Sequence, residues 1–539
     1  MKLRRIISSI LVVFCLGCVV GCDKDVTIQP YEYPTSNKSF SFYAYNAVRK
    51  NTYFDDMDHN IGESFVTLEK LQEYKDCGFD IMMCPSSYSP GGADHTWETI
   101  LDLAEQVGLK VLIADTRISA IADSSVSQIG EGATFANEDE MDAQIAVYMS
   151  DYIDHPAFYG IVMKDEPSAA ILQSGAYGQV YRSIKRVCPE AYMHVNTCSI
   201  GTYSTYRNHP SKFPELERDE YLAFVGGNLK DGGGSTLTAE EIEALSDDEF
   251  YTLFEDNVAT LDSTVRRNTQ FDIMEARYGK MLSMIIETTG TDHLAIDAYP
   301  MYDNPMTSYI RNLQVAADVT KEHGVDFHMV SQTMTLRPNG SDNDRILTDD
   351  DLRWLNNMIL GFGVKTICYF TYFTHDGNNN EQFIDGGSFI TNFGEKTDIY
   401  YSMQQIFKEN QAFAPTILNF DYVGSATYSI SPSYYAAEYC NVAKQNTFSK
   451  LSGVELDKEH ALVTELYDKT NEKYMYMVQN VVDSKFQGSK SYQTVTLTFA
   501  KEYKYALVYR NGKSTAVALN NHKLTVENRA GDAAYVLPY

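Results

Sequence analysis

The chain has 539 residues, of which 44% are hydrophobic and 22% charged, so it is long enough for two or three domains with a large buried core. It carries 73 acidic residues against 44 basic ones, which gives a formal net charge of −29. Because so acidic a surface repels phosphate backbones, nucleic acid is excluded as a partner.

The first 22 residues have the pattern of an export signal. A basic start and an apolar stretch end in Val19-Val20-Gly21-Cys22, which resembles the lipobox of bacterial lipoproteins. The resemblance implies cleavage before Cys22 and lipidation of its thiol; cleavage at Cys18 or an ordinary signal are the alternatives. Residues 23–38 form a polar tether that begins with an acidic tag similar to that of surface lipoproteins. We expect an outer membrane lipoprotein, on the cell surface or facing the periplasm, held to the membrane only by its lipid.

Eight apolar, β-rich runs alternate with amphipathic segments over residues 39–414. The runs are 40–48, 79–86, 109–115, 158–164, 191–197, 293–298, 325–332 and 365–372. Helices are expected at 64–77, 97–107, 138–154, 307–323 and 348–361, and four helices end at a glycine (Gly78, Gly108, Gly324 and Gly363). Eight strand–helix units predict an α/β fold, a (β/α)8 TIM barrel. A doubly wound open sheet is the alternative, but the glycine-rich phosphate-binding turn typical of that fold is absent from the sequence.

Two further segments complete the organisation. An insertion at about 201–290 contains two capping boxes, Thr238 with Glu241 and Ser246 with Glu249. It either walls a cleft on the catalytic face of the barrel or is a plain surface loop. Residues 415–539 contain runs of alternating apolar residues, at 473–482, 494–500, 503–509, 515–519 and 534–537, which predict a β-sandwich domain.

Polar residues mark the expected C-terminal ends of the barrel strands, where the reactive groups of this fold lie. Carboxylates, amides and phenols of this kind suit a neutral, polyhydroxylated ligand. The candidates are Asn46, Asp165, Glu166, Asn196, Asp297, Gln332, Tyr369 and Tyr372.

The clearest motif ends the fourth strand, where an apolar run leads into Lys164-Asp165-Glu166-Pro167. This segment resembles the glycoside hydrolases of (β/α)8 fold, in whose largest clan an Asn/Asp-Glu-Pro at this position supplies the general acid/base. The resemblance extends to Ala295-Ile296-Asp297-Ala298-Tyr299-Pro300 and to the aromatic run 368–372. It implies that Glu166 is the general acid/base, and a neighbouring carboxylate with partial burial would raise its pKa as that role requires. A salt-bridged or helix-capping Asp-Glu pair is the structural alternative.

The sequence departs from this family at strand seven, where the retaining clan has a Glu nucleophile. Here the strand ends in Gln332, and no Glu occurs between Glu322 and Glu381. Three explanations stay open. Asp297, Asp342 or Asp344 could be the nucleophile or the base. Asp165 and Glu166 also resemble the adjacent Asp-Glu of substrate-assisted N-acetyl-β-hexosaminidases, in which the substrate's 2-acetamido group attacks. Alternatively, the barrel has kept a sugar cleft and lost hydrolysis.

Other candidate sites are weaker. The spacing of Asp55-Asp56-Met57-Asp58-His59 does not match a calcium loop, and His375-Asp376 is either near the cleft or in a plain loop. His194 alternates with apolar neighbours and is interpreted as a core histidine. No zinc or serine-hydrolase motif is present, so no cofactor or metal is expected.

Together these observations predict a lipid-anchored glycoside hydrolase that cleaves an extracellular oligosaccharide or polysaccharide by carboxylate general acid/base catalysis. Glu166, Asp165 and Asp297 are the expected catalytic residues. The residues expected to bind the sugar are Asn46, Asn196, Tyr299, Gln332, Tyr369 and Tyr372. The alternative is a non-catalytic surface glycan-binding lipoprotein.

Overall fold

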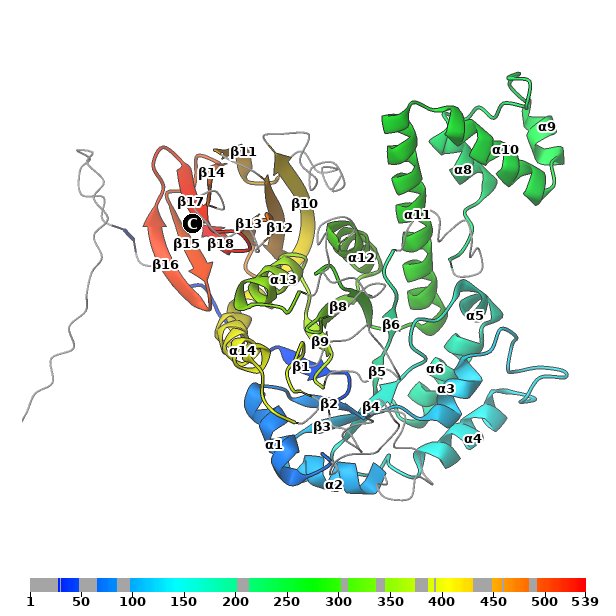
Figure 1. Ribbon diagram of the computed structural model, residues 1–539, viewed down its shortest axis with the longest axis horizontal. Helices are drawn as coiled ribbons and strands as arrows, with labels where there is room; N and C mark the ends of the chain where they lie inside the picture. The colour runs from blue at the N-terminus through cyan, green and yellow to red at the C-terminus, as the bar shows by residue number, and fades with distance from the viewer. Residues whose placement is uncertain are drawn as a thin grey trace, which may run out of the picture.

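The computed structural model describes residues 28–29, 31–47, 65–84, 97–200, 213–301, 309–335, 345–373, 386–391, 394–429, 448–457, 460–483 and 492–539. They form a region of parallel strands alternating with helices, followed by a region of antiparallel strands (Figure 1). The predicted mixed α/β fold with a C-terminal β region is therefore confirmed.

The parallel strands form two sheets, ordered β1-β9-β8-β7-β6 and β2-β3-β4-β5. The strands are β1 (Ser41–Ala44), β2 (Ile81–Cys84), β3 (Lys110–Ile113), β4 (Phe158–Val162), β5 (Tyr192–His194), β6 (Asn196–Thr197), β7 (His293–Ala298), β8 (Asp326–Gln332) and β9 (Thr366–Phe370). Each of the eight predicted runs contains a strand, and the run 191–197 contains both β5 and β6.

Backbone hydrogen bonds connect the two sheets at both of their edges. The N–H of Asp80, just before β2, donates to the carbonyl of Phe42 in β1 at 3.1 Å. On the other side, the N–H of Ala295 in β7 donates to the carbonyl of Val195, between β5 and β6, at 3.0 Å. Strands that follow one another along the chain are therefore in contact where one sheet ends and the other begins.

Helices follow the strands and cover their outer side (Figure 1). They are α1 (Leu68–Cys77), α2 (Trp97–Val107), α3 (Thr116–Ala122), α4 (Glu138–Met149), α5 (Ala169–Ser174), α6 (Ala176–Val187), α12 (Tyr309–His323), α13 (Asp349–Gly361) and α14 (Asp398–Ile417). The four glycines predicted at helix ends all have positive φ angles, from 67° to 122°. Glycine adopts such angles readily at the residue that follows a helix. Among the described helices, none is both long and apolar enough to cross a membrane.

Each parallel strand separates two apolar cores. Tyr43 and Val330 belong to a small cluster on the inner face of the strands. Phe42, Ala44 and Met329, their neighbours along the chain, belong to the large core that the helices cover. Successive side chains of a strand point to opposite faces, so this alternation decides which strand-end residues face inward.

Strands β4 and β5 approach so closely at Gly160 that no side chain fits between them. A Cβ on Gly160 would lie 1.8 Å from the carbonyl oxygen of Tyr192, and a backbone atom within a sheet cannot move aside as a flexible side chain would. Position 160 therefore requires glycine.

We expect Gly160→Ala to lower the free energy of unfolding by about 3 kcal/mol, because the added methyl forces β4 away from β5. Urea unfolding followed by circular dichroism measures the loss. Gly279→Ala is the matched control. Its Cβ would lie 3.7 Å from Val315, which is ordinary contact, and Gly279 lies inside a helix, where alanine is favoured over glycine by about 1 kcal/mol. Equal urea midpoints for Gly160→Ala and the wild type would contradict the expected clash.

The C-terminal region consists of a six-stranded sheet, ordered β10-β12-β13-β18-β15-β16, and a three-stranded sheet, ordered β11-β14-β17. Its strands are β10 (Asp421–Ser429), β11 (Leu451–Leu456), β12 (His460–Asp468), β13 (Lys473–Asn480), β14 (Gln493–Phe499), β15 (Tyr505–Arg510), β16 (Lys513–Ala518), β17 (Lys523–Asn528) and β18 (Ala533–Pro538). An apolar cluster with members from both sheets fills the space between them. Strands β10, β11, β12 and β17 lie outside the runs that were predicted from the sequence.

The central strands of the six-stranded sheet are buried on both faces, whereas its edge strand β16 is partly exposed. In β12, Ala461 and Val463 enter the core between the two sheets, whereas Leu462 and Leu466 enter the large core beside the helices. Polar contacts reinforce this second face: the Gln479 amide donates to the carbonyl of Trp354 in α13 at 3.0 Å. The C-terminal region is therefore packed directly onto the helices of the first region.

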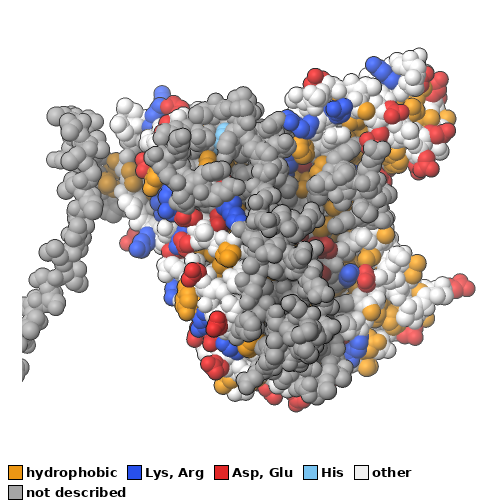
Figure 2. Space-filling model, in the orientation of Figure 1, with side chains coloured by type: hydrophobic (Ala, Val, Ile, Leu, Met, Phe, Trp, Pro, Cys, Tyr) orange, Lys and Arg blue, Asp and Glu red, His pale blue; other side chains and the backbone are white. Residues whose placement is uncertain are grey.

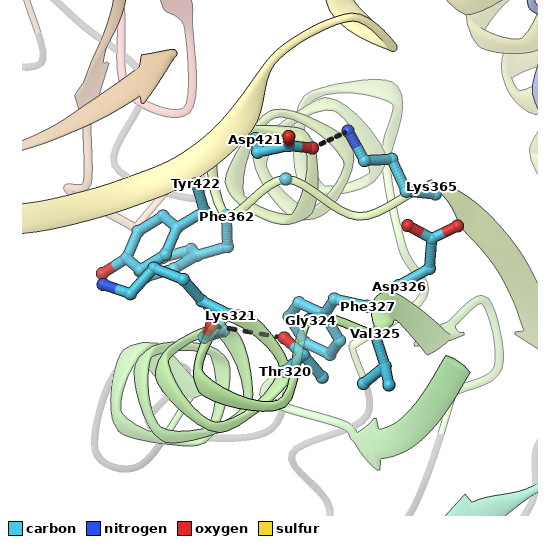
Figure 3. Close-up of a pocket in the computed structure, with 12 residues that line it drawn as sticks. Thr320, Lys321, Gly324, Val325, Asp326, Phe327, Phe362, Lys365, Asp421 and Tyr422 are labelled. Atoms are coloured by element: carbon cyan, nitrogen blue, oxygen red, sulfur yellow. Dashed lines mark hydrogen bonds and ion pairs between the residues drawn. The ribbon is translucent and has the colours of Figure 1, made fainter. Parts of the chain in front are cut away.

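A small pocket lies where the two regions meet, between α12 and the start of β10 (Figure 3). It has a volume of about 260 Å³, and an ion pair of 3.1 Å between Lys365 and Asp421 borders it. Asp326 at the start of β8 also lines it. The pocket thus lies at the N-terminal ends of the strands, opposite the predicted catalytic carboxylates.

The insertion between β6 and β7 has its own apolar core. Its helices are α8 (Arg218–Phe224), α9 (Ala239–Ala244), α10 (Asp247–Thr260) and α11 (Ser263–Thr289), and α11 carries them away from the strands (Figure 1). Both predicted capping boxes are present, at the starts of α9 and α10. Acidic side chains gather at this far end of the insertion (Figure 2).

Candidate active site

Asp165 and Glu166 lie in the turn that follows β4, and both reach solvent. Ser168 begins α5 by accepting a hydrogen bond from the N–H of Ile171, so the chain turns directly from strand into helix. Glu166 sits in this turn with φ at 45°, in the left-handed region. Such a conformation costs free energy in a non-glycine residue, so the surrounding turn must hold Glu166 in place.

Asp297 and Asn196 bring two more strands to the same place. Asp297 in β7 is 8% exposed, and Asn196 in β6 is 2% exposed. The Asn196 amide nitrogen donates to Asp165 Oδ1 at 3.0 Å and lies 3.5 Å from Asp297 Oδ2. The structure therefore brings together the three predicted catalytic carboxylates, with Asn196 between two of them.

Burial and crowding of negative charge favour a protonated carboxyl in this cluster. Burial is the largest cause that raises the pKa of Asp297 well above 3.8, followed by the charge of Glu166 and a hydrogen bond with it, and by the charge of Asp165. Burial also raises the pKa of Asp165, while hydrogen bonds from Asn196 and Tyr45 oppose that rise. Asp297 is the most buried of the three carboxylates, and the pKa of its carboxyl is raised well above its usual value.

Tyr299 lies next to this cluster, as predicted. It is half-buried and stacks on Phe370 with ring centroids 5.3 Å apart. Burial, and then the charges of Asp297 and Asp165, raise the pKa of Tyr299, so the phenol stays protonated. The two rings form an aromatic surface beside the carboxylates.

Gln332 and Asn46 hold the backbone at strand ends. Gln332 is 1% exposed; its Oε1 accepts from the N–H of Met301 at 2.8 Å, and its Nε2 donates to the carbonyl of Met334 at 2.9 Å. Asn46, with φ at 51°, accepts a hydrogen bond from the N–H of Phe373 through its backbone carbonyl. These contacts brace the loops around the carboxylates.

The structure corrects the prediction for Tyr369 and Tyr372. Both are 2% exposed and belong to the core between the strands and the helices. Tyr369 packs on Phe407 and Tyr372 on Tyr74, with centroids 5.3 and 4.8 Å apart. In β9 the inward-facing aromatic residue is Phe370, whereas the neighbouring Tyr369, which was predicted to face the sugar, faces the helices.

Tyr45 and His194 belong to the site, although the sequence analysis did not assign either to it. The Tyr45 hydroxyl donates to Asp165 Oδ1 at 3.2 Å and lies 3.0 Å from His194 Nε2. His194 is buried, as expected of a core histidine, but it reaches the carboxylates through this tyrosine. The alternation of Tyr192, His194 and Asn196 along the predicted run 191–197 was the available signal, because alternate residues of an extended segment share a face.

A cavity of about 760 Å³ lies between α5 and the start of the insertion. Its lining includes Ala169 and Gln173 from α5, and Glu215, Arg218 and Lys280 from the insertion. Because α5 directly follows the Asp165–Glu166 turn, this cavity lies on the same side of the strands as the carboxylates.

One surface group among the described residues has metal-binding residue types. Asp102, Glu105 and His155 place their ligand atoms within 4.8 Å of one another. However, His155 Nδ1 accepts a hydrogen bond from the N–H of Ala157 at 3.1 Å, so the neutral ring carries its proton on Nε2 and donates to Asp102. This arrangement satisfies the histidine without an ion.

Several predicted residues lie outside the described part of the chain. They are Cys22 with the signal segment, the loop 55–59, the alternative nucleophiles Asp342 and Asp344, and His375-Asp376. The corresponding predictions stay predictions.

No protein-family model and no curated protein sequence matches the chain. Solved structures that resemble it include a glycoside hydrolase, at 10% identity and a TM-score of 0.41, covering 93% of this chain and 92% of that one. A β-galactosidase from Bacillus circulans sp. alkalophilus has 8% identity and a TM-score of 0.40, over 94% and 100% of the two chains. An α-amylase from Geobacillus thermoleovorans has 8% identity and a TM-score of 0.39, over 93% and 98%. At these values the likeness assigns neither a fold nor an activity to this chain.

Proposed function

We propose that this protein is a lipid-anchored glycoside hydrolase that acts on glycans containing 2-acetamido sugars, with its active site at the C-terminal ends of a closed (β/α)8 barrel. The hydrogen bonds that connect the two parallel sheets, Asp80 to Phe42 and Ala295 to Val195, support closure. Lipidation at Cys22 would hold the enzyme at the outer membrane, where extracellular glycans are accessible.

The observation that carries the proposal is the meeting of Asp165, Glu166 and Asp297 at neighbouring strand ends, where burial and neighbouring charge raise the pKa of Asp297. Glycosidic cleavage requires a proton for the leaving oxygen near neutral pH. Glu166 reaches solvent and can approach that oxygen, while buried Asp297 retains the proton that the pair shares. Transfer from Asp297 through Glu166 would supply the general acid.

The contact between Glu166 and Asp297 favours the substrate-assisted mechanism. Carboxyl groups that act on opposite sides of a sugar are separated by about 5–5.5 Å in retaining enzymes and about 6.5–9.5 Å in inverting ones. A direct hydrogen bond between Asp297 and Glu166, which is among the causes of the raised Asp297 pKa, would leave no such space. The 2-acetamido oxygen of the substrate would attack the anomeric carbon as Glu166 protonates the departing oxygen. Water would then open the oxazoline, with Glu166 as the base.

Asp165 is suited to orient the acetamido group. Its Oδ1 accepts from both Asn196 and Tyr45, which fixes the carboxylate plane. A carboxylate held in this way can accept the acetamido N–H and align its carbonyl oxygen for attack. The Tyr299–Phe370 surface would lie against an apolar face of the sugar ring.

We expect the wild type to hydrolyse 4-nitrophenyl 2-acetamido-2-deoxyglycosides and to leave the matched 2-hydroxyl glycosides uncleaved. Release of 4-nitrophenol measures turnover, and a thiazoline analogue of the oxazoline should inhibit it. Asp165→Asn should lose most of this turnover. Cleavage of 2-hydroxyl substrates at a similar rate would remove the substrate-assisted mechanism. Glycan binding without turnover of any substrate would instead support a non-catalytic surface protein.

A further inference from the structure

A row of buried and half-buried tyrosines and histidines begins at Asp165 and runs down the inside of the parallel strands. The Tyr45 hydroxyl lies 3.2 Å from Asp165 Oδ1 and 3.0 Å from His194 Nε2. On the other side of the ring, His194 Nδ1 lies 2.7 Å from the Tyr43 hydroxyl. Both nitrogens of His194 are therefore engaged by phenols, one from Tyr43 in β1 and one from Tyr45, which directly follows β1.

The row continues to the opposite ends of the strands. The Tyr43 hydroxyl lies 3.4 Å from that of Tyr192, which lies 3.0 Å from His328 Nδ1. His328 stacks on His293 with centroids 4.4 Å apart, and Tyr192, His293 and His328 line a cavity of about 400 Å³. The row thus joins the carboxylates to a polar cavity at the N-terminal ends of β5, β7 and β8.

The chemistry of these groups gives the row one direction. Burial lowers the pKa of His194 to about 3, so its ring is neutral and carries one proton. Burial also raises the pKa of Tyr43, Tyr45 and Tyr192, so each phenol keeps its single proton. Because Tyr45 donates to Asp165, its oxygen accepts from His194 Nε2–H, and His194 Nδ1 then accepts from Tyr43.

We propose that this hydrogen-bonded row fixes the direction in which Tyr45 donates to Asp165, so that His194 and Tyr43 are positioning residues of the active site. Tyr43 keeps His194 in the tautomer with the proton on Nε2, and His194 keeps the Tyr45 proton on Asp165. If the other tautomer formed, His194 Nε2 would accept the Tyr45 proton and Asp165 would lose a donor. Only the catalytic role of Asp165 rests on the proposed function; the row itself does not.

Other titratable groups surround Asp165 and must stay unchanged in a test of the row. Lys164 and Glu166 flank it in the same turn, and Asp297 and Tyr299 approach from β7. Tyr177 of α6 and Cys368 of β9 also interact with its charge. Replacing Tyr43 or Tyr45 by Phe removes one hydroxyl and leaves all of these groups in place.

The test is to titrate Asp165 in protein labelled with ¹³C at the aspartate carboxyl groups, with Asp165→Asn assigning the signal. We expect Tyr45→Phe to raise the Asp165 pKa by about one unit, because the carboxylate loses a hydrogen-bond donor. Tyr43→Phe, which removes no direct contact of Asp165 in this row, should raise it by a smaller but measurable amount. Tyr74→Phe is the control. The Tyr74 hydroxyl is buried and accepts a hydrogen bond from the N–H of Ala44, next to Tyr43 in β1, but it lies outside the row.

A second measurement needs no substitution. In ¹⁵N-histidine-labelled protein, His194 should show a neutral ring with its proton on Nε2 from pH 5 to 8, assigned by loss of the signal in His194→Gln. A proton on Nδ1, or equal Asp165 pKa values in Tyr43→Phe and the wild type, would overturn the proposal. Neither measurement uses a substrate, so both stand if the protein proves not to be a hydrolase.

Discussion

Glu166→Gln is expected to lower turnover of an unactivated glycoside by about 10³-fold, because glutamine cannot deliver a proton to the leaving oxygen. Substrate binding should change little, since glutamine keeps the size of the side chain and its hydrogen-bonding oxygen. Glycosides with a 2,4-dinitrophenol leaving group need little protonation and should lose far less turnover. Steady-state kinetics with a poor and a good leaving group measure this difference.

The matched control for this substitution is Glu131→Gln, which removes the charge of an exposed glutamate that is not one of the three clustered carboxylates. It should leave kcat and KM at wild-type values. An equal loss for both leaving groups in Glu166→Gln would exclude a general-acid role for this residue. Retained turnover with both substrates would remove Glu166 from the mechanism.

Asp297→Asn is expected to lower turnover by about 10²-fold or more and to stabilise the protein at neutral pH. Turnover falls because the buried group that stores the proton is gone. Because the pKa of Asp297 is raised, the folded protein binds a proton at this carboxyl more tightly than the unfolded chain does. Its favourable contribution is present below the unfolded value of 3.8 and is lost as pH rises through the folded pKa.

Asparagine does not titrate, so Asp297→Asn should gain stability over the wild type as pH increases. We expect little difference at pH 3.5 and a gain of about 1 kcal/mol at pH 8. Urea unfolding at the two pH values measures the gain, and Asp231→Asn, at an exposed position in the insertion, is the control. If Asp297→Asn were less stable than the wild type at pH 8, an ionised Asp297 carboxylate would not be unfavourable in the folded protein.

The sequence was sufficient to place the parallel strands and most of their helices. Each strand is a short apolar run, and glycines such as Gly78 and Gly324 mark where a helix ends and a strand follows. Strands β11 and β17 place only two or three apolar residues each among polar ones such as Glu455 and Lys523, so neither contains the dense apolar run by which the other strands were identified. The chain alone also cannot specify which faces of the six-stranded sheet are covered.

The candidate site was predicted in part because its carboxylates sit at strand ends, but the direction of each side chain was harder to predict. The run 368–372 is apolar or aromatic at nearly every position, so its sequence does not show that Phe370 faces inward and Tyr369 outward. Tyr43, Tyr45 and His194 resemble core residues because they are buried. Their hydrogen bonds depend on β1 and β5 facing each other across the interior, which no local pattern encodes.

The six-stranded sheet, whose central strands are covered on both faces, limits how this protein can evolve. Many β-domains attached to enzymes are gained, lost or exchanged between genes as independent cassettes. Here Leu462, Leu466 and Met477 complete the core of the neighbouring helices, so deletion of the C-terminal segment would leave those helices with an open apolar flank. Both regions must therefore be inherited together, and substitutions in one constrain those accepted in the other.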